Sequence, residues 1–125
     1  MENPNKHRPG ITHGWRAAGI ALQGLRAAWL HEDAFRQEVI IALVAIPSAF
    51  LLPVAPLGRI LMIASILLVL IVELLNSALE AAVDYISLDH HPLAKRVKDI
   101  ASAAVFLSIV NVLVVWGLVI NTNLL

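Results

Sequence analysis

The sequence predicts an all-α integral membrane protein with three transmembrane helices. Its 125 residues are 59% hydrophobic and only 14% charged, and the mean hydropathy is +0.81. Soluble domains are about 45–50% apolar and about 25% charged, and so small a chain buries only part of its surface. A lipid-facing exterior accommodates the excess of apolar residues. The formal net charge is zero, which argues against a general attraction to nucleic acid. The chain has no cysteine, which excludes disulfides and a thiolate nucleophile.

The N-terminal part combines a polar tail with one amphipathic segment. Residues 1–13 contain two prolines and a glycine, and we expect a flexible tail. In the segment 14–33, apolar residues recur at spacings of three and four, which places them on one face of a helix. This segment is too polar to span a bilayer and carries two tryptophans on its apolar face, so we expect a helix in the membrane interface. The apolar positions are Trp15, Ala18, Leu22, Leu25 and Trp29.

Three apolar runs are predicted to cross the membrane, at about 35–53, 57–86 and 100–121. The apolar core of the first run is shorter than the roughly 20 residues of a perpendicular span, so this span also takes in the turn around Phe35. With the surface helix, the three spans form a single membrane domain, 1–125.

Basic residues predict the orientation of these spans. Five precede the apolar core of the first span, three lie between the second and the third span, and Arg59 is the only one on the other side. Since loops rich in lysine and arginine stay in the cytoplasm, we expect a cytoplasmic N-terminus and a periplasmic C-terminus.

The second span carries a row of polar residues, which we call the polar seam: Glu73, Asn76, Ser77, Glu80 and Asp84. Their offsets of 0, 3, 4, 7 and 11 place them on one stripe of a helix. Contact with a neighbouring helix would explain an asparagine and a serine. It explains carboxylates poorly, because a charged group at bilayer depth costs at least about 2.5 kcal/mol and usually marks function. The pattern therefore favours a functional role for Glu73 and Glu80, and more weakly for Asp84.

Acidic groups without cysteine or clustered histidines favour a hard cation held by oxygen. Magnesium fits best, since proteins bind it through one or two carboxylates together with substrate phosphates. Glu32 either completes such a site or is a solvated charge at a helix end, and spacing does not decide between them. In the expected loop before the third span, Lys98 could neutralise phosphate charge and Asp99 could join the acidic group. The adjacent histidines of this loop, His90 and His91, are only weak evidence of a zinc site.

In this order the residues resemble the bacterial diacylglycerol kinase family of small membrane-embedded lipid kinases. The resemblance covers nearly the whole chain apart from its tail. Its most specific parts are the Glu-x-x-Asn-x-x-x-Glu pattern of the seam and the Lys98–Asp99 pair. The matching stretches are 24–29 with Glu32, 34–38, 71–80, 94–99 and 102–105.

This resemblance implies ATP-dependent phosphorylation of diacylglycerol to phosphatidic acid by a homotrimer in the bacterial inner membrane, at its cytoplasmic face. Glu73 would be the general base, supported by Asn76, while Glu32 and Glu80 would hold Mg²⁺ with ATP. The remaining positions divide between nucleotide (Asp89, His90, His91, Lys98 and Asp99) and lipid substrate (Arg26, Trp29, Glu38, Arg59, Ser102 and Trp116, with Glu73).

One position departs from the family pattern, and other functions stay open. Relatives usually carry an arginine where this chain has His13, so a nucleotide contact there does not follow directly. An undecaprenol kinase of the same family is the nearest alternative. The motif Ala-Ala-Trp29, followed by Glu32 and residues 35–38, favours diacylglycerol as the substrate. A non-enzymatic subunit that conducts ions or protons along the seam is the alternative of a different class.

Overall fold

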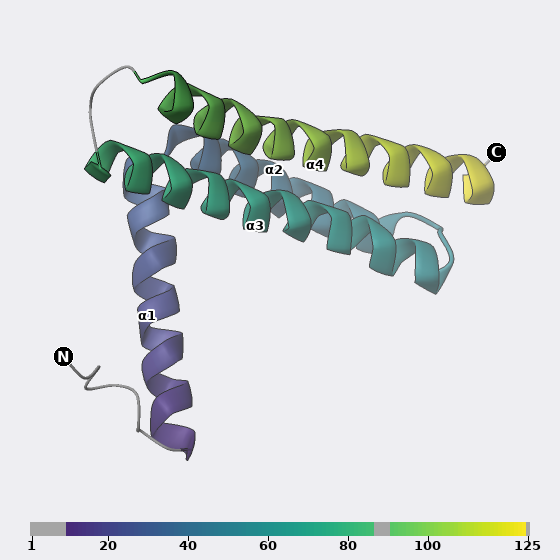
Figure 1. Ribbon diagram of the computed structural model, residues 1–125. Helices are drawn as coiled ribbons and strands as arrows, with labels where there is room; N and C mark the ends of the chain where they lie inside the picture. Colours follow the sequence, from purple (N-terminus) through teal and green to yellow (C-terminus); the bar gives the residue numbers. More distant parts are fainter. Residues whose placement is uncertain (1–9, 87–90, 125) are drawn as a thin grey trace. The chain divides into compact units, whose positions relative to one another are not determined.

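The computed structural model describes residues 10–86 and 91–124, with side chains for 13–86 and 91–123. The chain forms two compact units, Met1–Glu32 and Asp33–Leu125. The first unit contains one helix and the second a bundle of three helices (Figure 1). The helices are α1 (Gly10–His31), α2 (Asp33–Leu51), α3 (Pro56–Ile86) and α4 (Pro92–Leu124).

The helix α1 begins four residues earlier than the sequence predicted. Gly14 was taken as its start, yet the helix runs through this position, because a glycine weakens a helix by about 1 kcal/mol without ending it. The predicted tail therefore ends before Gly10, and its first nine residues lie outside the described part of the chain.

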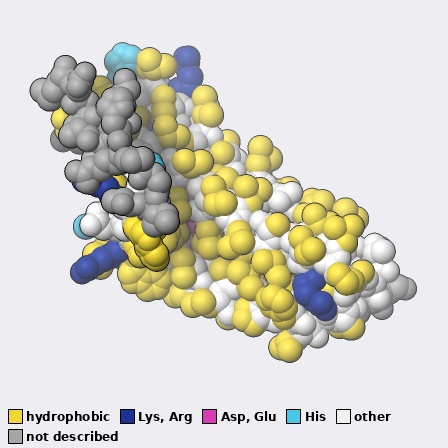
Figure 2. All heavy atoms as spheres, turned by 90° about the horizontal axis from the view of Figure 1, so that it is seen from below, with side chains coloured by type: hydrophobic (Ala, Val, Ile, Leu, Met, Phe, Trp, Pro, Cys, Tyr) yellow, Lys and Arg dark blue, Asp and Glu magenta, His cyan; other side chains and the backbone are white. Residues whose placement is uncertain are grey.

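The prediction of three spans is confirmed. Helices α2, α3 and α4 are long and apolar enough to cross a membrane. Their outer faces carry exposed leucines, isoleucines and valines, and hydrophobic side chains cover much of the surface visible in Figure 2. In water such a surface would be unfavourable, whereas in a bilayer it contacts lipid tails.

Helix α3 lies at the centre of the bundle and packs against both α2 and α4. Pro56 is its first residue, where a proline's missing N–H is not needed. Near this end a small core forms, in which Met62 is fully buried. Its other members are Ala49, Val54 and Val119.

Arg59 closes the connection between α2 and α3. Its Nε donates a hydrogen bond to the carbonyl of Ala49 (3.0 Å), and its Nη2 donates to those of Leu52 (3.1 Å) and Val54 (3.5 Å). The last carbonyls of a helix have no partner within it and carry partial negative charge. The guanidinium therefore caps the end of α2, and the lipid-side role that resemblance to the family implies for Arg59 stays a prediction.

The end of α4 is fastened to the same connection. The backbone N–H of Ala55 donates to Asn123 Oδ1 (3.0 Å), and the indole N–H of Trp116 donates to the carbonyl of Met62 (3.2 Å). Trp116, which the sequence also placed on the lipid side, thus joins α4 to α3. These contacts, with those of Arg59, tie all three helices together at this end.

Gly58 allows α3 and α4 to approach closely, and its substitution is our first prediction. A Cβ atom at Gly58 would lie 2.8 Å from Val119 Cγ1, and a valine in a helix has little rotamer freedom to move away. We expect Gly58→Ala to destabilise the bundle by about 1–3 kcal/mol, measured as a lower thermal midpoint in detergent. The double variant Gly58→Ala/Val119→Ala should recover most of this loss. A loss that Val119→Ala deepens would contradict the explanation.

Helix α4 begins earlier than the predicted third span. Residues 92–99, expected to be a polar loop, form the first turns of α4, so that expectation was wrong. Pro92 suits a helix start, and a Lys95–Asp99 ion pair (2.6 Å) spans one turn. The apolar pattern alone missed these turns, because four of the eight residues 92–99 are charged and interrupt it.

Candidate active site

The polar seam of α3 passes from the interior of the bundle to its surface. Glu73 is 4% exposed, and Asn76 and Ser77 are each 9% exposed. One turn later Glu80 is half-buried, and Asp84 is exposed. The seam therefore offers a path from apolar surroundings to a polar end, as its helical spacing indicated.

Buried polar atoms with unmet hydrogen bonds lie along this path. Within the described chain, no hydrogen-bond partner is found for Asn76 Oδ1, Ser77 Oγ or Glu38 Oε2. Buried polar atoms are nearly always paired, so unpaired ones indicate strain, water or a missing ligand. Three such atoms near one seam are typical of a site that receives a ligand.

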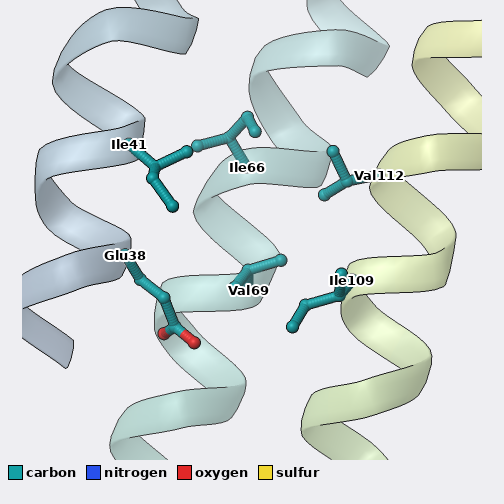
Figure 3. A pocket seen from close by; sticks show the side chains of 6 residues that line it. All are labelled: Glu38, Ile41, Ile66, Val69, Ile109 and Val112. Carbon is teal, nitrogen blue, oxygen red and sulfur yellow. The ribbon is translucent and has the colours of Figure 1, made fainter. Parts of the chain in front are cut away.

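Glu38 brings a second carboxylate from α2 to the seam. It interacts electrostatically with Glu73 on α3, and two like charges repel at close range. Next to Glu38 lies a cavity of about 150 Å³, which side chains of all three helices of the bundle line (Figure 3). The other lining residues are Ile41, Ile66, Val69, Ile109 and Val112.

At the polar end of the seam, charged side chains of α3 and α4 contact one another. Asn76 Nδ2 donates to Glu80 Oε1 at 3.4 Å, and Lys98 Nζ donates to Asp84 Oδ1 at 2.7 Å. Lys98 is also attracted by Glu80. Lys98 and Glu80 were predicted from the sequence to be site residues. In the structure they form one cluster of charged side chains together with Asp84.

The other nucleotide candidates lie at the start of α4 or beyond the described chain. His91 Nδ1 accepts a hydrogen bond from the backbone N–H of Leu93 (3.0 Å) and so caps α4. Asp99 is paired with Lys95. Asp89 and His90 lie outside the described residues.

The remaining candidates separate by unit. Glu32, His13, Arg26 and Trp29 belong to the first unit, where the N–H of Glu32 continues α1 by donating to the carbonyl of Ala28 (2.9 Å). In the second unit Ser102 is exposed on α4. Arg59 and Trp116 lie near the start of α3, away from Glu73 and Glu80, and bond to backbone carbonyls.

The donors present suit a magnesium ion that arrives with ATP. Among the described residues, no three histidine or acidic side chains gather in a cation site, so a fully protein-made cage is not indicated there. One or two carboxylates with substrate phosphates are enough for Mg²⁺. Glu80 supplies one carboxylate with an oxygen beyond the one bonded to Asn76.

Comparison with known proteins gives this arrangement a family. The family model for prokaryotic diacylglycerol kinase matches residues 19–120. The chain belongs to the prokaryotic diacylglycerol kinase family. It is 48% identical to the diacylglycerol kinase of Pseudomonas aeruginosa (strain PAO1) over 94% of this chain and 96% of that protein. It is 48% identical to the diacylglycerol kinase of Escherichia coli (strain K12) over 86% of this chain and 88% of that protein. It is 41% identical to the diacylglycerol kinase of Helicobacter pylori (strain 26695) over 94% of this chain and 91% of that protein.

Membership in this family identifies the chain as an enzyme of the kinase type and confirms the resemblance seen in the sequence. The matched region includes Glu32, the whole polar seam and the Lys98–Asp99 pair, and it leaves out His13. Individual residue roles stay predictions. The ion pair between Asp84 and Lys98 at the end of the seam was not predicted from the sequence, since an attraction between residues 14 positions apart has no local signature.

Proposed function

We propose that this protein transfers the γ-phosphoryl group of ATP to the primary hydroxyl of diacylglycerol, giving phosphatidic acid for phospholipid metabolism. The observation that carries the proposal is the polar seam, with a buried carboxylate at Glu73 and a charged group at its other end. A lipid hydroxyl approaches from the bilayer and ATP from water, so the reaction must occur where such a seam crosses the interface. The names of the relatives support the choice of substrate.

In this proposal Glu73 is the general base. Its carboxylate accepts the proton of the lipid hydroxyl as the hydroxyl oxygen attacks the γ-phosphorus, and the bond to the ADP oxygen breaks. Phosphoryl transfer depends mainly on positioning and on charge neutralisation. Asn76, one turn from Glu73, would hold the reacting groups, since its Oδ1 is buried without a partner among the described residues.

The charged end of the seam would bind Mg–ATP. Glu80 and Glu32 would hold the metal, which when bound neutralises phosphate charge. Lys98 would contact the phosphates. Asp99, His91, Asp89 and His90 would surround the rest of the nucleotide.

The apolar side of the seam would receive diacylglycerol. Glu38 reaches the seam from α2 and borders the cavity in Figure 3, so its carboxylate is available to accept a hydrogen bond from the hydroxyl group of the lipid. Arg26, Trp29 and Ser102 would contact the substrate nearer the interface, where tryptophan is favoured.

The surroundings of the reaction follow from charge and family resemblance. We propose that α1 lies on the inner membrane surface, that the N-terminus is cytoplasmic and that the C-terminus is periplasmic. Lys95, Arg96 and Lys98 would then lie on the cytoplasmic side. A homotrimer, with sites between subunits, would cover part of the exposed apolar surface.

Our second prediction concerns the lipid. Purified protein in mixed micelles with γ-labelled ATP should form labelled phosphatidic acid from diacylglycerol, with one ATP consumed for each product molecule, and should label undecaprenol far less. Parallel assays with equal mole fractions of each lipid measure this preference. Labelling of undecaprenol alone would identify the long-chain isoprenoid alcohol as the substrate and contradict the proposal.

A further inference from the structure

One ion pair joins two helices at the charged end of the seam. Lys98 Nζ on α4 lies 2.7 Å from Asp84 Oδ1 on α3, and the two residues are 14 positions apart. By contrast, the Asp33–Arg36 and Lys95–Asp99 pairs each lie within one helix. The Asp84–Lys98 pair therefore fixes a lysine of one helix relative to the polar seam of another.

The position of the Lys98 ammonium is not determined by the helix alone, because the lysine side chain is long and flexible. A lysine ammonium is a point charge on a four-carbon stem with many rotamers. Bonding to Asp84 restricts that freedom and keeps the ammonium near Glu80, which also attracts it. The charge is thus held at the end of the seam before any ligand arrives.

This pairing leaves Lys98 able to bind a phosphate. An ammonium has three N–H donors, and one is used by Asp84. The side chains of Lys98 and Asp84 are 41% and 50% exposed, so an anion from water can approach. The lysine can therefore bind a phosphate oxygen without leaving Asp84.

We propose that Asp84 is a positioning residue for the nucleotide, which orients Lys98 towards the phosphates of Mg–ATP. This inference rests on the proposed function, in which Lys98 contacts ATP. Asp84 itself need not touch the substrate. Because exposed ion pairs add little to stability, a merely structural pair predicts at most a small shift in thermal midpoint and no selective effect on ATP.

The test compares Asp84→Asn and Asp84→Ser with the wild type, in detergent and with both substrates varied. We expect the KM for Mg–ATP to rise about tenfold in each variant, while the KM for diacylglycerol and the thermal midpoint stay close to wild type. Asp84→Glu should restore most of the ATP affinity. Asp33→Asn, which removes a carboxylate from an exposed ion pair on α2, is the matched control and should behave as wild type.

A double-variant cycle shows whether Asp84 acts through Lys98. In a Lys98→Gln background, Asp84→Asn should have no further effect on the KM for Mg–ATP. The inference would be overturned if the Asp84→Asn and Lys98→Gln effects on the KM for Mg–ATP were independent and multiplied. It would also be overturned by an unchanged KM for Mg–ATP in the active Asp84 variants, or by an equal rise in the KM for lipid. A wild-type protein that binds no non-hydrolysable ATP analogue and phosphorylates no lipid would instead overturn the proposed function, and this inference with it.

Discussion

Replacing Glu73 by glutamine should reduce phosphoryl transfer by about 10²- to 10⁴-fold, the range of one positioned general base. Glutamine keeps nearly the same shape but cannot accept the hydroxyl proton in the transition state. The loss should fall on kcat, with both KM values near those of the wild type, since binding of the two substrates does not require proton transfer. Initial rates with saturating Mg–ATP and diacylglycerol measure this effect.

A second buried polar residue of α3 provides the control for this substitution. Ser65 is 3% exposed, and its Oγ donates to the carbonyl of Met62 in its own helix (2.7 Å). Ser65→Ala changes a buried polar group away from the proposed site and should keep kcat within about twofold, because such helix hydrogen bonds add only about 1 kcal/mol. Nearly full activity of Glu73→Gln would show that another group takes the proton.

Glu80→Gln should act on the metal and nucleotide rather than on the proton. Loss of one preorganised charge at a phosphoryl-transfer site is expected to reduce kcat/KM for Mg–ATP on the order of 10²-fold. Because glutamine is a weaker ligand for a hard cation than a carboxylate, higher free Mg²⁺ should recover part of the activity. Titration of magnesium at fixed ATP measures this requirement.

The companion variant Glu80→Asp separates charge from shape. It keeps a carboxylate but shortens the side chain, which also weakens the contact with Asn76 at 3.4 Å. We expect its magnesium requirement to lie between those of the wild type and Glu80→Gln. Equal magnesium curves for the wild type and Glu80→Gln would exclude the metal-holding role, even if the overall rate falls.

The sequence was sufficient for the parts of the fold that depend on local pattern. Apolar runs predicted the three long helices of the bundle. The spacing of acids on α3 predicted one seam, and the structure adds that burial decreases along it from Glu73 to Asp84. Both follow from helical periodicity, which a single segment contains in full.

Contacts between segments could not be read in the same way. Arg59 was given a lipid-side role by resemblance, yet its guanidinium bonds to three carbonyls around the end of α2. The approach of Lys98 to Asp84 depends on how α4 packs against α3. The lipid role of Arg59 stays a prediction, but these hydrogen bonds already give the residue a function in the bundle.

The site role expected for Glu32 rests on resemblance to the family. Glu32 ends the first unit and the seam belongs to the second. The expected metal ligands Glu32 and Glu80 therefore come from separate units of the chain. Resemblance to the family brought them together in the prediction, since no periodicity links a residue outside α3 to its seam.

Transfer of the γ-phosphoryl group from ATP to a lipid hydroxyl at the polar seam is tested most directly by one reconstitution experiment. Wild type and Glu73→Gln are reconstituted side by side in vesicles that contain diacylglycerol and undecaprenol, and labelled product is counted with γ-labelled ATP while ion flux is recorded. We predict labelled phosphatidic acid with the wild type, almost none with Glu73→Gln, and no flux with either. Ion flux that Glu73→Gln abolishes, without ATP consumption by the wild type, would contradict the claim.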